Sequence, residues 1–160
     1  MKMGTHDQRL SIAARCLTVG GFFLGAAAVF HLLAASHIPM VLKRVLDPKT
    51  YAFLEPIVSF TFLLNAVLLL PLSFSTLYCA AAIRRGEPWA RWIGLANALT
   101  VLALPCLLVW SMGLRYFADA PLFLAGALSV AIAGLLMILP LLWAWRDIES
   151  HHDQRGSEND

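Results

Sequence analysis

The chain has 160 residues, 59% of them hydrophobic and 14% charged, and this composition excludes an ordinary water-soluble domain, which is less apolar and more charged. The net charge of +2 is too small to indicate a nucleic-acid-binding surface, and the twelve Lys and Arg are scattered between apolar blocks rather than gathered on one face. The three cysteines lie in or beside these blocks without a CxxC pair, so we expect them to be small apolar packing residues.

Four apolar blocks follow one another along the chain, and each is long enough to cross a bilayer as a helix, which needs about 20 residues. In lipid the backbone must satisfy its own hydrogen bonds, and strand alternation is absent, so all four are predicted to be α-helices. The predicted spans are residues 13–36, 57–83, 89–113 and 121–146. Residues 1–147 are thus predicted to form an all-α integral membrane domain, an antiparallel four-helix bundle, and residues 148–160 a disordered cytoplasmic tail.

The first block carries a GxxxG pair, Gly21 and Gly25, which lets helices approach closely, either within one chain or in a homodimer. His31 lies near the end of this block and His37 directly after it, six residues further on. On a helix their directions differ by about 120° and their heights by about 9 Å, so one helix cannot bring both to one metal ion. We therefore expect neither a metal ion nor a cofactor. His31 is either a hydrogen-bonded residue that fixes helix register or a pocket residue beside Glu55.

The connection between the first two blocks, residues 37–56, contains three prolines and the sequence VLKRVL. Its alternating apolar and basic pairs are compatible with a short interfacial helix that places Lys43 and Arg44 near lipid phosphates. An ordinary polar loop is the alternative.

Polar residues of the second block share one broad helix face of roughly 120°, when counted at 100° per residue. They are Glu55, Ser59, Asn65, Ser73 and Thr76. Asn97 and Thr100 of the third block are the expected partners across the helix pair. One interpretation is a set of interhelical hydrogen bonds worth about 0.6 to 2 kcal/mol each. The other is a polar-lined pocket for a lipid or quinone, formed by His31, Glu55, Ser59, Asn65 and Asn97.

The turn between the second and third blocks, RRGEPWAR, is short and should make these helices antiparallel neighbours. Gly86 suits a helix C-cap, and Pro88 can open the next helix. The turn resembles those of many small bacterial four-span proteins, including proteins related to DoxX. The resemblance covers these eight residues and implies no functional residue.

The fourth block contains a second ridge of small residues, Ala125, Ser129 and Ala133, which is another predicted helix-packing face. Like the GxxxG pair, it serves contacts within the chain or between two copies.

The distribution of positive charge predicts the orientation. With four spans the termini share one side, and that side carries eight of the twelve cations: Lys2, Arg9, Arg15, Arg84, Arg85, Arg91, Arg146 and Arg155. The positive-inside rule therefore places both termini in the cytoplasm, with the chain in the bacterial inner membrane. Tryptophans near the predicted cytoplasmic ends fit an aromatic belt; they are Trp89, Trp92, Trp143 and Trp145.

No motif in the chain specifies a reaction, and no Ser/His/acid set or Gly-x-Ser-x-Gly motif is present, so we predict no catalytic residue. The first hypothesis is a non-enzymatic accessory or interaction subunit that packs against other membrane subunits or a second copy. The alternative is a binder of a hydrophobic small molecule, or an oxidoreductase accessory, that uses the polar-lined pocket. Besides these subunits, the bilayer is the expected partner, and nucleic acid is not.

Overall fold

The structure, a computed structural model, describes residues 5–113 and 121–145. The regular structure in these ranges is helical throughout, and it comprises α1 (Thr5–Val45), α2 (Pro48–Arg84), α3 (Trp89–Met112) and α5 (Pro121–Trp143). Each of these four helices contains a stretch long and apolar enough to cross a membrane. The expectation of an all-helical chain with four long apolar elements is confirmed for the described residues.

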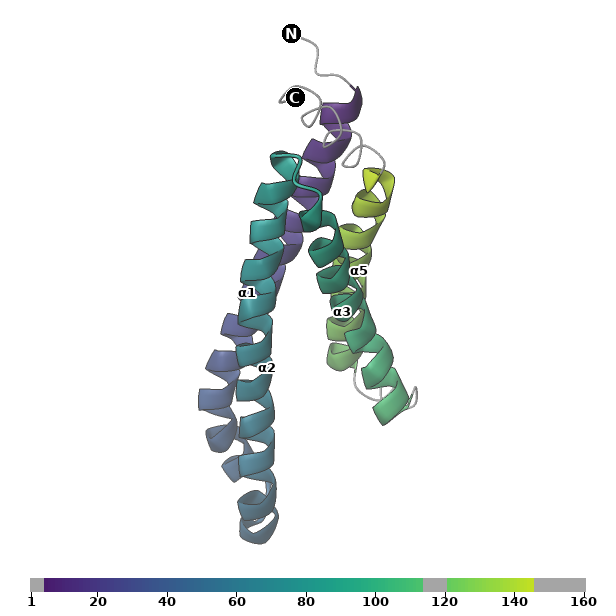
Figure 1. The fold of residues 1–160 in the computed structure, drawn as a ribbon. Helices are drawn as coiled ribbons and strands as arrows, with labels where there is room; N and C mark the ends of the chain where they lie inside the picture. The colour runs from purple at the N-terminus through teal and green to yellow at the C-terminus, as the bar shows by residue number, and fades with distance from the viewer. Residues whose placement is uncertain (1–4, 114–120, 146–160) are drawn as a thin grey trace. The chain divides into compact units, whose positions relative to one another are not determined.

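The chain divides into two compact units (Figure 1). Residues Phe22–Phe74 form the first, which we call the hairpin unit. The described residues of the second, which we call the core unit, are 5–21, 75–113 and 121–145. Helices α1 and α2 each contribute to both units, whereas α3 and α5 belong to the core unit alone.

In the hairpin unit α1 and α2 fold back along one another around a link of two residues, 46–47. Asp47 caps α2, because its Oδ1 accepts hydrogen bonds from the backbone N–H groups of Lys49 and Thr50 at 3.1 and 3.2 Å. Pro48 follows at the first helical position, where its missing N–H has no cost. Hydrogen bonds from the Thr50 side chain and backbone hold the pKa of Asp47 below its ordinary value.

The predicted loop or short interfacial helix over residues 37–56 is wrong. Helix α1 continues to Val45, and α2 begins at Pro48, so Pro39 and Pro56 both lie inside helices. A proline removes one backbone donor, but a long apolar helix tolerates it when the segment otherwise bonds within itself. Only Asp47–Pro48 combines a capping side chain with a helix-starting proline, and this is where the chain turns. As a result α1 and α2, with 41 and 37 residues, are longer than the predicted spans.

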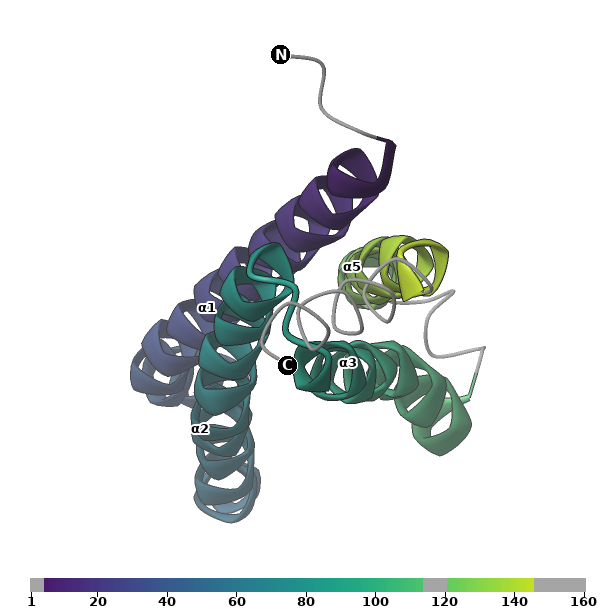
Figure 2. The same ribbon diagram turned by 45° about the horizontal axis from the view of Figure 1, so that its top comes forward.

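The core unit is built around small side chains. In Figures 1 and 2, α3 and α5 run side by side, and they pack directly on one another. The buried cluster is formed by Leu10, Ala13, Ala14, Leu17, Cys79, Ala80, Ala82, Ile83, Ala90, Ala98, Met137, Ile138, Leu141 and Ala144. The many alanines allow helix backbones to approach closely, which matters in lipid because apolar side chains gain little by leaving it for a helix interface.

Glycines mark the closest approaches. A Cβ atom added to Gly134 of α5 would lie 3.1 Å from the backbone N and Cα of Leu102 in α3. A Cβ on Gly20 would meet the Met137 side chain at 2.6 Å. The absence of a side chain at these positions therefore sets how closely the helices of the core unit pack.

The GxxxG pair of α1 packs within the chain. Gly21 lies against Leu77 in the core unit, and Gly25 lies against Ser73 in the hairpin unit. A Cβ atom added at these glycines would approach the neighbouring side chains to 2.7 and 3.0 Å. The intramolecular use of the motif left open by the sequence is therefore the one seen in this structure.

The predicted ridge of α5 differs from the buried face. Ala133 is buried, but Ala125 and Ser129 are exposed, and the Ser129 hydroxyl donates to the Ala125 carbonyl at 2.8 Å. The buried face is formed by Ala127, Ala133, Gly134, Met137, Ile138 and Leu141. A strict four-residue repeat drifts by about 40° at each step, whereas a face that contacts a neighbouring helix alternates steps of three and four.

We expect Gly134→Ala to lower the free energy of unfolding by about 1 to 3 kcal/mol, because its Cβ would press on the backbone of α3. Gly126→Ala is the matched control on the same helix, since a Cβ at Gly126 meets nothing within 4 Å. Unfolding of the two variants in mixed micelles, followed by circular dichroism, makes the comparison. Equal stability of the two would contradict the close approach.

Candidate functional site

A buried polar cluster joins α2 and α3 in the core unit. The Asn97 side chain, 8% exposed, donates its two amide hydrogens to Ser75 Oγ at 2.9 Å and Thr76 Oγ1 at 3.2 Å. Thr76 is fully buried and Ser75 half-buried, so the bond to Thr76 is formed away from water. Two donors matched to two hydroxyl acceptors fix the rotation and register of α2 against α3.

The sequence predicted Asn97 to bond to the polar face of the second helix but did not identify Ser75. Counted at 100° per residue from Glu55, Ser75 falls at about 200°, outside the predicted face. Ser75 can be identified as a partner only from the position of Asn97, whose amide group bonds to the hydroxyls of two consecutive residues. Thr100, the other predicted partner, is exposed and donates to the Ala96 carbonyl of its own helix at 2.9 Å.

His31 lies in the hairpin unit and is bonded within its own helix. Its Nδ1 donates to the Ala27 carbonyl oxygen at 2.8 Å, because a carbonyl oxygen can only accept. The ring also packs against Phe62 of α2, with centroids 5.4 Å apart, and against Phe30 at 5.9 Å. The hydrogen bond lies within α1, so of these contacts only the packing on Phe62 joins α1 to α2, and the role of His31 as a register residue remains a prediction.

The other predicted ligand-binding residues of the hairpin unit lie at several levels along α2. Ser59 donates to Glu55 Oε1 at 3.1 Å, which joins two members of the predicted set. Ser59 and the half-buried Asn65 are one turn on either side of Phe62, the residue that contacts His31, whereas Glu55 is seven residues, or about 10 Å, from Phe62 along the helix.

Within the described ranges no hydrogen bond is seen for the Asn65 side chain. Asn97 belongs to the core unit, so the set is divided between the two units. A single pocket formed by all five residues remains a prediction.

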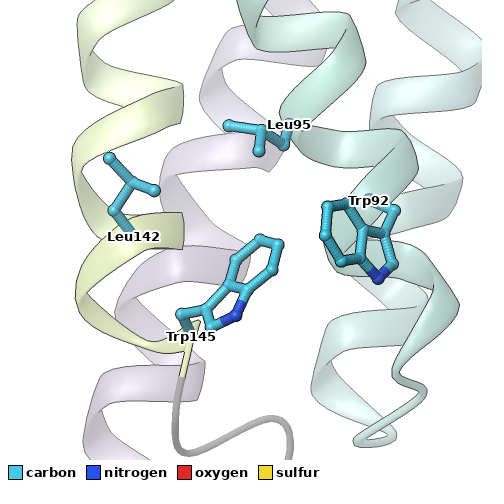
Figure 3. A pocket seen from close by; sticks show the side chains of 4 residues that line it. All are labelled: Trp92, Leu95, Leu142 and Trp145. Carbon is cyan, nitrogen blue, oxygen red and sulfur yellow. The ribbon is translucent and has the colours of Figure 1, made fainter.

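A groove bordered by tryptophans lies in the core unit. Its volume is about 400 Å³, and Trp92, Leu95, Leu142 and Trp145 line it (Figure 3). The two indoles meet edge to face with centroids 4.8 Å apart. The guanidinium of Arg91 lies 4.7 Å from the ring centroid of Trp145 and 5.6 Å from that of Trp92. The site therefore combines an apolar floor, aromatic walls and a positive charge.

The sequence identified these tryptophans only as part of an interfacial belt. Trp92 and Leu95, like Leu142 and Trp145, are three residues apart and share a helix face, which is a detectable signal. That the two pairs face one common groove depends on how α3 packs on α5, and the sequence contains no local signal for that packing.

The turn before α3 holds the neighbouring residues in place. Gly86 has a φ of 73°, its N–H donates to the Ile83 carbonyl, and the Glu87 N–H donates to that of Ala82, which together form the predicted glycine C-cap of α2. One Glu87 oxygen accepts from Arg85 Nε and the other from Trp89 Nε1, both at 2.6 Å. The hydrogen bond and the charge of Glu87 raise the pKa of Arg85 above its ordinary value.

Comparisons with protein-family models, with curated proteins and with solved structures find no match to this chain. The roles of its residues therefore rest on the contacts described above.

We expect Asn97→Leu to destabilise the protein by about 1 to 4 kcal/mol, because it removes two hydrogen bonds to α2, each worth about 0.6 to 2 kcal/mol, and leaves the hydroxyls of Ser75 and Thr76 with fewer partners. Thr100→Val, one turn along α3, should leave stability unchanged, since Thr100 bonds only to its own helix among the described residues. Unfolding in mixed micelles measures both. The interhelical cluster is refuted if the two variants behave alike.

Proposed function

We propose that this chain is a multi-pass protein of the bacterial inner membrane, with both termini in the cytoplasm, that serves as a non-enzymatic interaction subunit of a membrane complex. The hairpin unit is the proposed contact surface. The observation that carries the proposal is the group of exposed apolar side chains beside exposed cations at the end of that hairpin, around the 46–47 link.

The end of the hairpin exposes an unusual mixture of side chains. Val45 is 75% exposed and Phe53 69%, and Met40 and Val41 are exposed as well. The exposed cations Lys43 and Arg44 lie in the same last turns of α1. Apolar groups beside basic ones suit a partner surface that is itself apolar and carries acidic residues.

The length of α1 supports the position of this surface at or beyond the membrane boundary. Between Arg15 and Lys43 the helix carries no Asp, Glu, Lys or Arg over 27 residues, which is about 40 Å of helix. The hydrocarbon core is about 30 Å thick, and the average helix tilt of about 20° shortens the projection of this stretch only slightly. The apolar side chains nearest Lys43 are therefore expected in the headgroup region or beyond it, where a protein partner can cover them.

The polar side chains of the hairpin support a structural role. His31, His37 and Thr61 each bond to a backbone carbonyl of their own helix, the carbonyls of Ala27, Leu33 and Ile57. Bonds of this kind satisfy polar groups within their own helix, as a segment in lipid requires. This pattern favours a contact surface over a catalytic site.

The orientation can be tested with reporters. We expect an alkaline phosphatase fused after Asp160 to be inactive and a green fluorescent protein fused there to be fluorescent, because the positive-inside rule keeps that end in the cytoplasm. The same reporters inserted at Asp47, in the link between α1 and α2, should give the opposite result. An active phosphatase after Asp160 would contradict the proposed topology.

The proposed partner surface can be tested by photo-crosslinking in cells. We expect p-benzoylphenylalanine at Phe53 to form an adduct with one other membrane protein, identified by mass spectrometry, whose contact segment contains acidic residues. The same probe at Trp110, which is 85% exposed on α3, is the matched aromatic control and should form no such adduct.

Charge reversal at Lys43 and Arg44 should reduce the Phe53 adduct about fivefold or more, since each cation contributes roughly 1 kcal/mol to an attraction of this kind. Adducts with lipid alone, or equal adducts from Phe53 and Trp110, would overturn the proposal. An adduct with a second copy of the chain would replace the heterologous subunit by a homodimer.

A further inference from the structure

We propose that two copies of this chain pair in the membrane along one face of α2 in the hairpin unit. The side-chain amides of the two Asn65 residues bond to one another at the centre of that contact. The inference rests on the proposed membrane location but not on the proposed partner subunit, and it assigns a second copy of the chain to a different face of the same unit.

Asn65 lies deep in an apolar stretch of α2. Between Glu55 and Arg84 the helix carries no Asp, Glu, Lys or Arg over 28 residues, which is about 42 Å of helix. Asn65 stands 10 residues, or about 15 Å, after Glu55, so it is about 7 Å from the middle of this stretch. A hydrocarbon core about 30 Å thick, centred on the stretch, therefore encloses the Asn65 side chain.

The Asn65 amide makes no hydrogen bond with any residue in the ranges 5–113 and 121–145. The hydroxyls nearest to it on α2 are already donated elsewhere, Thr61 to the Ile57 carbonyl at 2.8 Å and Ser59 to Glu55 Oε1 at 3.1 Å. Hydrocarbon cannot bond to an amide, so a partner that supplies a donor and an acceptor is strongly favoured. Asn65 is half-buried, so such a partner can reach its amide from the outer surface.

Asn65 belongs to a stripe of side chains with the spacing of a helix–helix seam. The stripe consists of Val58, Thr61, Asn65, Leu68 and Leu72, which follow one another in alternating steps of three and four residues. Two helices that pack at about 20° meet along this repeat, and a single asparagine in such a seam fixes register and partner number. No member of the stripe is buried, and Leu68 is 60% exposed.

Helix α1 covers a different face of α2. Phe62 contacts His31, Ala66 is 1% exposed, and Ser73 lies against Gly25. At 100° per residue, these three α2 residues fall within about 40° of one another, and the centre of the stripe is about 100° away from them. The stripe therefore stays open in the folded hairpin unit.

The chemistry of the amide selects a second copy as the partner. A carboxamide has both donors and an acceptor, so two of them form a pair of N–H···O bonds. Two copies inserted in the same direction and related by a twofold axis along the membrane normal place each seam residue opposite its own copy, at the same depth. Asn65 then meets Asn65 directly. The remaining amide hydrogen can bond to Thr61 Oγ1, which donates to a carbonyl and retains its lone pairs.

Sedimentation equilibrium of the purified full-length protein in mild detergent tests the pairing. We expect a reversible monomer–dimer equilibrium that Asn65→Leu weakens about tenfold, which corresponds to about 1.4 kcal/mol. Asn65→Gln keeps the carboxamide and should weaken the dimer by no more than about threefold. Thr100→Val, which removes an exposed hydroxyl of α3 outside the stripe, is the control and should leave the equilibrium unchanged. Circular dichroism verifies that each variant is folded.

Disulfide crosslinking in native membranes, with iodine as the oxidant, identifies the face that pairs. The variants carry Cys106→Ala, because Cys106 is the exposed one of the three native cysteines. Leu68→Cys should then give a crosslinked dimer of the chain. Val67→Cys is the matched control and should give none, since Val67 is 57% exposed but lies about 140° round the helix from the centre of the stripe.

Several results would overturn the proposal. A protein that stays monomeric, or a folded Asn65→Leu variant that dimerises as well as the unmodified protein, would remove the role of the amide. Equal crosslinking at positions 67 and 68 would show random collision, and a crosslink from position 68 to another protein would assign the stripe to that protein. Phe53, which tests the partner subunit, lies about 120° round α2 and about 18 Å along it from Asn65, so either proposal can fail while the other stands.

Discussion

Close approach of helix backbones is the constraint on which the core unit depends. In lipid the hydrophobic effect contributes little to helix association, so contact must come from dispersion forces and from hydrogen bonds between helices. Gly134 brings α5 against the backbone of α3, and Gly20 makes room for Met137. At these glycines even a methyl group would collide with the neighbouring helix, so only a narrow range of helix rotations is possible. The rotation in turn sets which other side chains face the neighbouring helix.

The second constraint is that every polar group in an apolar environment needs a partner. Most hydroxyls and imidazoles described here find one in their own helix, as Thr61 and His31 do. Asn97 differs, because its partners are Ser75 and Thr76 on another helix. Such a bond is specific to one register, so it selects a single arrangement of α2 and α3 from those that the small residues alone would permit.

The two units thereby acquire different surfaces. In the hairpin unit His31, His37 and Thr61 bond to carbonyls of their own helix, and apolar side chains are exposed beside cations near the turn. In the core unit the guanidinium of Arg91 lies close to the rings of Trp92 and Trp145, which border an apolar groove.

The sequence by itself determined the features that depend on neighbouring residues. The four apolar helices, the glycine cap at Gly86 and the near-correct limits of α3 and α5 follow from apolar run length and local capping. Local signals also misled at residues 37–56, where three prolines suggested a loop although only Asp47–Pro48 breaks the helix.

Only the tertiary structure decided which faces meet. It chose Gly134 rather than Ala125 and Ser129 for the contact between α3 and α5, gave Asn97 the unexpected partner Ser75, and brought Trp92 and Trp145 to one groove. These outcomes depend on the rotation and register of helices far apart in the sequence. No short stretch of the sequence predicts this rotation, because it results from the packing of all the contacting side chains together.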